Sequence, residues 1–151
     1  MSTERIYTSR RMNIIEALVT KLKDIDGSGA YLMDVNENVH PRLQFWDEIE
    51  EFPAIHLNAG SETREYQGGG YKDRFLNITV RCYVNQEDSV EALDELLEDV
   101  ETVLEENSRM VYNNRLGIEE LIQQITIISI DTDEGVLDPL GVGEILIEVR
   151  Y

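Results

Sequence analysis

The alternation of side chains over residues 75–84, within a predicted strand at residues 71–84, is the strongest constraint on the fold of this chain. Apolar residues occupy every second position over most of this run, which is the period of a β-strand with one buried face. The inward set is Leu76, Ile78, Val80, Cys82 and Val84, and the outward set is Phe75, Asn77, Thr79, Arg81 and Tyr83. A sheet that buries one face requires a second layer of structure over that face.

Residues 89–106 are predicted to supply this second layer, because their apolar side chains recur at helical spacing. They fall within an arc of roughly 140° when each residue turns the helix by about 100°, and Ser89 is the expected N-cap. The apolar residues are Val90, Leu93, Leu96, Leu97, Val100, Val103 and Leu104. Another amphipathic helix is predicted over residues 9–25, with Ser9 as its N-cap.

Short apolar runs predict the other strands. Residues 54–58 are expected to pair with the alternating strand around the polar stretch 59–70, and residues 31–35 to form a further short strand. Residues 125–130 and 143–151 are expected to form a second hairpin, because turn-forming residues separate these two β-rich runs.

Two further helical turns are expected, one at residues 118–122 and one in which Phe45, Trp46 and Ile49 pack on the core. This order of elements predicts an α+β fold of two layers, with a largely antiparallel sheet of four to five strands and two main helices on one face. The 151 residues are expected to form one domain, residues 1–151.

The formal net charge of −18, from 31 acidic and 13 basic residues, argues against a protein that holds nucleic acid by its phosphates. The first residues lack the apolar run of a signal peptide, and no window approaches the roughly 20 apolar residues of a membrane span. We therefore expect a soluble cytoplasmic protein with no membrane partner.

Two glycine-containing segments resemble ligand-binding loops only in part. Residues 24–29, DIDGSG, match the start of a calcium loop, but the twelfth position, which needs a bidentate carboxylate, is Val35. We interpret this segment as the turn that ends the first helix. Gly68, Gly69 and Gly70 lead into a strand rather than into the helix of a phosphate-binding loop, and we interpret them as a hairpin tip.

The remaining polar residues predict no metal ion, no cofactor and no catalytic centre. His40 and His56 have no cysteine or paired acidic neighbour at zinc-ligand spacing, and Cys82 is interpreted as a buried core thiol. The carboxylates of residues 131–135 are interpreted as a solvated turn rather than a metal or acid-base site. No serine lies in a nucleophile elbow, so we expect no enzymatic activity.

An acidic run between residues 85 and 106 contains ten carboxylates and no lysine or arginine. Those on the helical arc opposite the leucines are Glu91, Asp94, Glu95, Glu98, Asp99, Glu101, Glu105 and Glu106. Such a face is usually only solvated. Because no interleaved lysine relieves the repulsion at i to i+4 spacing, a functional use of the negative field is the alternative interpretation.

Basic residues are concentrated at the start of the chain, where the first 23 residues have a net charge of +3 and leave −21 on the remainder. A subunit with one basic end can associate head to tail, the type of contact that closes into rings. Tyr66 and Tyr71 flank the predicted glycine tip. They are either strand ends packed on each other or contact residues of a projecting arm.

Five segments of the chain follow one another in a characteristic order. They are an arginine-containing helix at residues 10–24, FPAIHL at 52–57, a hairpin ending in LNITVRCY at 76–83, the helix 89–106, and DPLG at 138–141 before a strand that ends on Tyr151. In order and spacing they resemble the tail terminator proteins of long-tailed bacteriophages, the minor tail or tail-completion family. The resemblance covers nearly the whole chain.

This resemblance implies a structural virion protein at the head-proximal end of the tail, assembled in the host cytoplasm. Members of the family form a hexameric ring on the tail tube, end tube polymerisation and present a surface to head-completion or neck proteins, and DNA passes through the ring without specific binding. A subunit or tube interface is then expected at Arg10, Arg11, Tyr66, Gly68, Gly69, Gly70 and Tyr71. The acidic channel is expected at Glu91, Glu95, Glu98 and Asp99, where negative charge would repel the DNA backbone.

Two other functions stay open from the sequence. A related head-to-tail connector, neck or baseplate subunit would follow the same assembly logic and would differ in the complex that it binds. A small enzyme or ligand-binding α+β domain would require a convergent polar pocket, which the sequence does not reveal.

Overall fold

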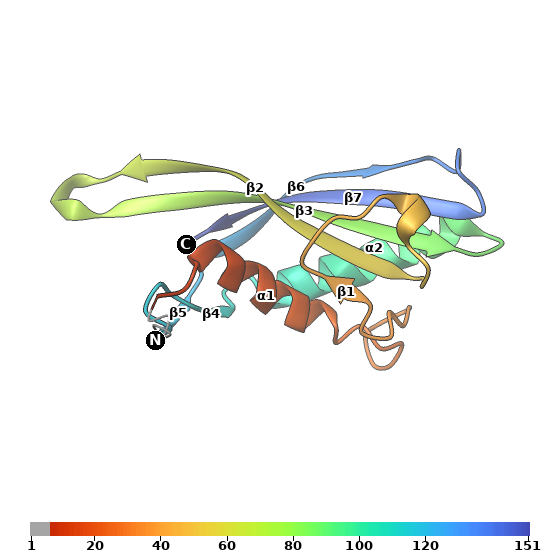
Figure 1. Cartoon of the computed structure of the whole chain (residues 1–151), viewed down its shortest axis with the longest axis horizontal. Coiled ribbons are helices and arrows are strands. Elements are labelled where there is room, and N and C mark those ends of the chain that lie inside the picture. Colours follow the sequence, from red (N-terminus) through yellow and green to blue (C-terminus); the bar gives the residue numbers. More distant parts are fainter. Residues whose placement is uncertain (1–6) are drawn as a thin grey trace, which may run out of the picture.

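The computed structural model describes residues 7–151 and consists of a twisted sheet with two helices on one face (Figure 1). The helices are α1 (Arg10–Leu22) and α2 (Ser89–Glu106), and short 3-10 turns lie at η1 (Trp46–Glu48) and η2 (Gly68–Gly70). The strands are β1 (Val39–His40), β2 (Ala54–Tyr66), β3 (Lys72–Asn85), β4 (Val111–Asn113), β5 (Glu119–Leu121), β6 (Gln124–Thr132) and β7 (Leu140–Arg150). Within this described part, no helix has the length and apolar character needed to cross a membrane.

Five strands form the main sheet in the order β1-β2-β3-β7-β6, while β4 and β5 form a small separate sheet. Neighbouring strands of the main sheet are antiparallel, except that β1 and β2 are parallel. The central strand β3 pairs with β2 on one side and with β7 on the other. The predicted α+β fold with a largely antiparallel sheet is confirmed.

The core lies between the sheet and the two helices. The inward residues of β3, from Leu76 to Cys82, are fully buried as the alternation predicted. α1 contributes Ile14, Ile15, Leu18, Val19 and Leu22, and α2 contributes Leu93, Leu96, Leu97, Val100, Val103 and Leu104. The approach of α2 to β7 is close at Gly143, where a methyl group would lie 3.2 Å from the Leu93 side chain.

The two helices begin with side-chain caps. Ser9 caps α1 as predicted, accepting a hydrogen bond from the Met12 backbone N–H at 3.3 Å. The cap of α2 is Asp88, which accepts from the Glu91 backbone N–H at 3.2 Å, so the prediction of Ser89 was wrong by one residue. Ser89 is instead the first helical residue, and its hydroxyl donates to Asp138 at 2.5 Å. A carboxylate at the N-cap also interacts favourably with the helix dipole.

Two of the minor elements differ from the prediction. Residues 31–35 form an irregular segment rather than a strand, because the N–H groups of Leu32 and Met33 donate to Asp99 and not to a neighbouring strand. Residues 119–121 are a strand and not a helical turn, since they pair with β4 around Gly117. Gly117 has a φ of +76°, a conformation that glycine adopts without steric cost.

Polar residues 60–66 were expected to be a loop but continue β2, and they pair in register with β3 as far as Tyr66 and Lys72. The helical turn expected near Phe45 does form, as η1. Its packing was predicted wrongly, because the side chains of Phe45 and Trp46 are 74% and 55% exposed.

Candidate functional site

The β2–β3 hairpin extends past the helices at one end of the sheet, and we call residues 60–75 the arm (Figure 1). β3 begins to pair with β7 only at Phe75 and Arg150, so most of the arm consists of two strands paired with each other. Its tip, residues 66–72, contains the glycine turn that the sequence predicted. Tyr66 and Tyr71 are 73% and 76% exposed there, with their rings open to solvent.

At the base of the arm, Glu62 is bound both by the distant residue Tyr151 and by Arg64 of the same strand. The Tyr151 hydroxyl donates to the Glu62 carboxylate, and Arg64 Nε donates to the same carboxylate at 2.9 Å. Burial alone raises the pKa of Glu62, but these hydrogen bonds outweigh burial and place the pKa below its usual range. Burial and the bond to Glu62 raise the pKa of Tyr151 to about 12.

Arg11 also contacts the base of the arm, where its guanidinium donates to the carbonyl of Gly60. This contact lies beside the irregularity in the β2–β3 register between Ala59 and Glu62. The sequence suggested that Arg10 and Arg11 face a neighbouring subunit or the tube. The structure places Arg11 against its own chain, and both Arg10 and Arg11 are partly exposed on α1.

The acidic face of α2 is present, with Glu91, Glu98 and several other carboxylates exposed and Glu95 partly exposed. The ion pairs among the described residues join Arg64 to Glu62, Arg81 to Glu144, and Arg150 to Asp73. None of these pairs involves α2. The charge of this face is therefore left without a basic partner in the described part of the chain.

Asp99 does not belong to this exposed face, and the prediction that it does was wrong. Its side chain is 1% exposed and accepts hydrogen bonds from the N–H groups of Leu32, at 2.9 and 3.0 Å, and Met33, at 2.7 Å. The helical arc was assigned correctly, but the segment 31–35 crosses over this position. The carboxylate thus satisfies backbone donors that would otherwise be buried without partners.

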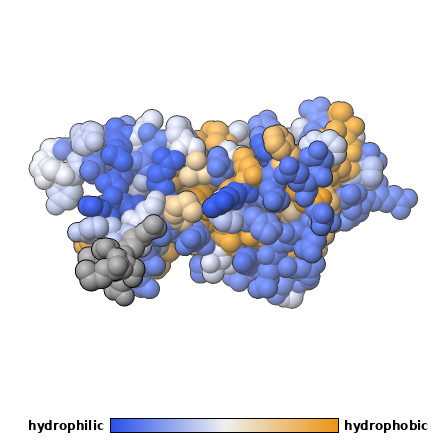
Figure 2. Space-filling model, viewed as in Figure 1, coloured by the Kyte–Doolittle hydropathy of each residue, from blue (hydrophilic) through white to orange (hydrophobic). Residues whose placement is uncertain are grey.

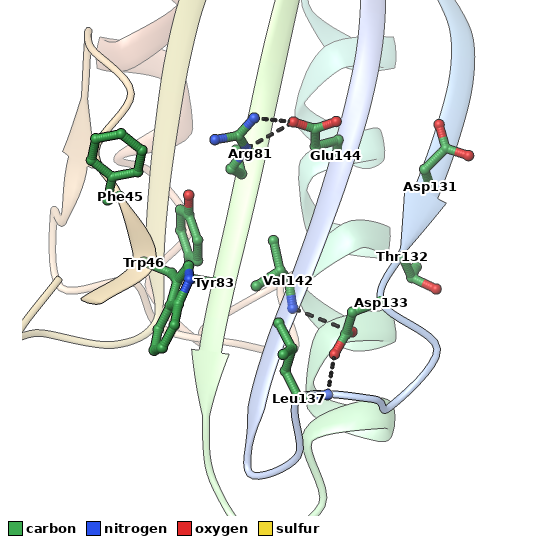
Figure 3. Close-up of a pocket in the computed structure, with 10 residues that line it drawn as sticks. All are labelled: Phe45, Trp46, Arg81, Tyr83, Asp131, Thr132, Asp133, Leu137, Val142 and Glu144. Carbon is green, nitrogen blue, oxygen red and sulfur yellow. Dashed lines mark hydrogen bonds and ion pairs between the residues drawn. The ribbon is translucent and has the colours of Figure 1, made fainter. Parts of the chain in front are cut away.

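A groove of about 370 Å³ lies on the face of the sheet opposite the helices (Figure 3). It is at the end of the sheet away from the arm, where Tyr83 pairs with Val142. We call it the aromatic groove. Phe45 and Trp46 form one wall, Leu137, Asp131 and Asp133 form the other, and the floor consists of Arg81, Tyr83, Val142 and Glu144. Arg81 donates to Glu144 at 2.8 Å through its Nε, and Asp133 accepts from the backbone N–H groups of Leu137 and Val142.

Sequence reasoning missed this groove. The cluster 131–135 was interpreted as a solvated turn, whereas Asp133 is partly buried and organises the turn between β6 and β7. Phe45 and Trp46 were assigned to the core. The signal available in the sequence was the aromatic pair in a polar segment, next to Pro41 and a run of acidic residues.

The histidines and the DIDGSG segment have structural contacts. His56 is 1% exposed, and its Nδ1 lies 2.8 Å from the carbonyl of Arg42. Burial lowers the pKa of His56. Asp26 accepts from the Ser28 N–H and hydroxyl in the turn after α1. Across residues 7–151, no three His, Cys, Asp or Glu side chains converge as a metal ion would require.

The notable features of the molecule are a projecting arm, an acidic helix face and an exposed aromatic groove. All three are surfaces suited to contact with other macromolecules, as is typical of a subunit of a larger assembly. The family model for the bacteriophage tail tube terminator protein matches residues 8–151, and the chain belongs to this family. It is therefore a component of the virion tail, and the family predicted from the sequence is confirmed.

One relative agrees with this assignment, and one solved structure has a similar fold. The chain is 31% identical over 149 residues to the tail tube terminator protein p142 of Escherichia phage T5, a match covering 93% of this chain and 92% of that protein. A chain from the virion of a native gene transfer agent particle has a similar fold, with a TM-score of 0.57 and 7% sequence identity. That match covers 94% of this chain and 96% of the other.

Proposed function

We propose that this protein ends the tail tube as a closed ring of subunits, six in number, at the head-proximal end. The ring stops polymerisation of the tube protein and provides the surface to which head-completion or neck proteins bind. Its role is structural, without catalysis. The single observation that carries this proposal is the arm, which reaches beyond the core with its tip exposed.

A two-stranded hairpin is marginally stable by itself in water, so an exposed arm is best explained by a partner that packs against it. Tyr151, through Glu62, and Arg11, through Gly60, hold the base of this arm in one direction. An element held in its bound orientation loses less conformational entropy when it binds. The support at the base therefore favours an arm that docks on a neighbouring subunit or the tube.

The acidic face of α2 is assigned to the channel. Glu91, Glu95 and Glu98 belong to a helix face that makes no ion pair within residues 7–151, and several copies around a ring would add their fields. The negative potential would keep the DNA backbone from binding the wall during its passage. Asp99 is excluded from this role because it is buried.

The basic first helix is assigned to contacts within and between subunits. Arg11 supports the arm of its own chain, while Arg10 is available to a neighbour or to the tube. Because the remainder of the chain is strongly acidic, a basic residue at a subunit contact would attract the adjoining copy.

Deletion of residues 68–70 tests the proposed role of the arm. The shortened subunit is expected to fold with an unchanged melting temperature but to leave tails without a terminal ring and with uncontrolled tube length. Electron microscopy of tails assembled with the variant measures both properties. Normal tail ends would mean that the arm is only a connector between two strands.

Neutralisation of the α2 face tests the proposed channel. The triple substitution E91Q/E95Q/E98Q is expected to leave the ring intact and to increase the DNA retained in tails after ejection. The matched control E105Q/E106Q changes two carboxylates at the far end of the same helix. A ring whose channel is lined by neutral or basic residues would contradict this assignment.

A further inference from the structure

The arm tip lies at one end of the sheet (Figure 1), and the aromatic groove lies toward the other end, where Tyr83 pairs with Val142. We propose that the arm tip of one subunit occupies the aromatic groove of a second copy of this chain. This inference rests on the proposed ring and identifies the two surfaces that would join its subunits.

The groove has the exposed apolar surface of a binding site. Phe45 is 74% exposed, Trp46 is 55% exposed, and across the groove Leu137 is 41% exposed beside Val136, at 82%. On the face seen in Figure 2, apolar residues gather over the half of the molecule away from the arm, whereas the arm end is largely hydrophilic. Aromatic residues exposed in this way are enriched at protein interfaces, where they carry much of the binding energy.

The size of the groove suits side chains of the tip. Its volume of about 370 Å³ lies within the range of roughly 300–1,000 Å³ typical of ligand sites. Tyr66 and Tyr71 project from the tip as two aromatic rings with polar hydroxyls. Rings of this kind can pack on Phe45 and Trp46 while their hydroxyl groups reach the polar floor.

Charge favours the same pairing. The groove carries Asp131, Asp133 and Glu144 against one basic residue, Arg81, which is already bound to Glu144. Within the tip, residues 66–72, the only charged side chain is Lys72, whose ammonium lies 5.9 Å from the centre of the Tyr66 ring. Lys72 thus places a positive charge on the aromatic tip, with Glu65 and Asp73 behind it on the arm, and an acidic groove favours the orientation in which Lys72 enters first.

The positions of tip and groove explain why the occupant is another copy. The tip lies at one end of the sheet (Figure 1) and the groove toward the other, so a chain cannot fill its own groove. Each bound tip leaves one free tip and one free groove in the pair, and the same contact can repeat until the chain of subunits closes. This is a heterologous interface, which produces a ring when the rotation between copies closes.

Cysteine crosslinking on assembled tail ends tests the contact. Gln67 in the tip and Val136 beside the groove are both exposed, so the double variant Q67C/V136C should fold normally. The native Cys82 is buried, and burial raises its thiol pKa to about 12, which keeps it unreactive. A short bis-maleimide crosslinker should convert the double variant into a ladder of multimers ending at the closed ring.

The control variant Q67C/E98C places the second cysteine on the exposed face of α2 and should give no ladder. Dimers formed by Q67C alone would indicate contact between two tips and would overturn the inference. Rings visible by microscopy but without a ladder would overturn the inference and leave the proposed function standing. Tail ends without any ring of this protein would refute the proposed function, and the contact with it.

Discussion

The two ends of the β2–β3 hairpin are paired in the same way but surrounded differently. Near Val80 and Leu57 the strands lie beneath the helices, and both side chains are fully buried. Near Tyr66 and Lys72 the register continues, yet both side chains are exposed. Backbone pairing therefore extends over both halves of the hairpin, apart from the irregularity between Ala59 and Glu62, while burial stops where the helices end.

The two halves of the hairpin therefore serve different properties: one the stability of the folded subunit, the other its contacts with partners. The covered half contributes apolar burial, which dominates folding free energy, whereas the arm contributes hydrogen bonds whose net stabilisation is small. Substitutions in the covered half are expected to change the stability of the isolated subunit. Substitutions in the arm are expected to change assembly. The predictions below test that separation, from the largest expected change in unfolding free energy to the smallest.

The largest effect is expected from L96A, in the centre of α2. Leu96 is fully buried, and truncation should lower the free energy of unfolding by about 2–5 kcal/mol because it leaves a cavity in the core. The matched control L116A changes a leucine that is 57% exposed and should cost no more than about 0.5 kcal/mol. Urea denaturation of both variants measures the difference, and equal losses would mean that α2 does not cover the core.

A smaller loss is expected from D99N. The carboxylate of Asp99 accepts bonds from two backbone N–H groups, and an amide would present its own donors to them. The expected cost is about 1–3 kcal/mol. The neighbouring exposed residue supplies the control, since E98Q should leave stability within about 0.5 kcal/mol of the parent. A neutral D99N would show that the contact with Leu32 and Met33 is not maintained in solution.

A pH-dependent loss of stability is expected from protonation of His56, in the covered half of β2. Burial lowers its pKa from 6.5, so below that pH the unfolded state binds the proton more readily than the folded state. Stability present at higher pH is then lost as the pH falls below about 6.5, with a slope of at most about 1.4 kcal/mol per pH unit.

The H56N variant should show a shallower decline than the parent between about pH 7.5 and pH 5.5. H40N removes the exposed histidine beside it, whose charge adds to burial in lowering the pKa of His56, so its decline should be only slightly shallower than that of the parent. Chemical denaturation across this pH range supplies both slopes. Identical slopes in parent and H56N would assign the pH dependence to other groups.

The smallest change in stability is expected from the arm variant Y66A/Y71A. Both side chains are about three-quarters exposed, so the free energy of unfolding should stay within about 1 kcal/mol of the parent. The same variant should fail to form terminal rings on tails, as judged by microscopy. A loss of stability comparable to that of L96A would remove the distinction between the two halves of the hairpin.

The main elements could be predicted from local sequence because each has a buried face that leaves a period in the pattern. β3 and α2 were found in this way, with the helix bounds matching residues 89–106. The outer half of β2 was not, because residues 60–66 have no buried face and are strand only through hydrogen bonds to β3. Pairing of this kind produces no apolar alternation that a sequence could reveal.

The candidate site, like the fold, could be predicted only in part. A glycine triplet between two tyrosines indicates an exposed turn, and the tip is found there. The aromatic groove was not predictable, since Phe45 and Asp133 are distant in the sequence and line one groove only because β3, β7 and β6 lie side by side. The groove therefore depends on the order of the strands in the sheet.

The sequence by itself determined the two layers, the apolar faces of the helices and the acidic character of α2, because these follow from residue type and spacing along one element. Tertiary structure alone decided which members of each face are covered. Asp99 shares the helical arc of Glu91 and Glu95 but is buried, and Phe45 has the character of a core residue but is exposed. Burial depends on which distant segment crosses a given position, and that is a property of the folded chain.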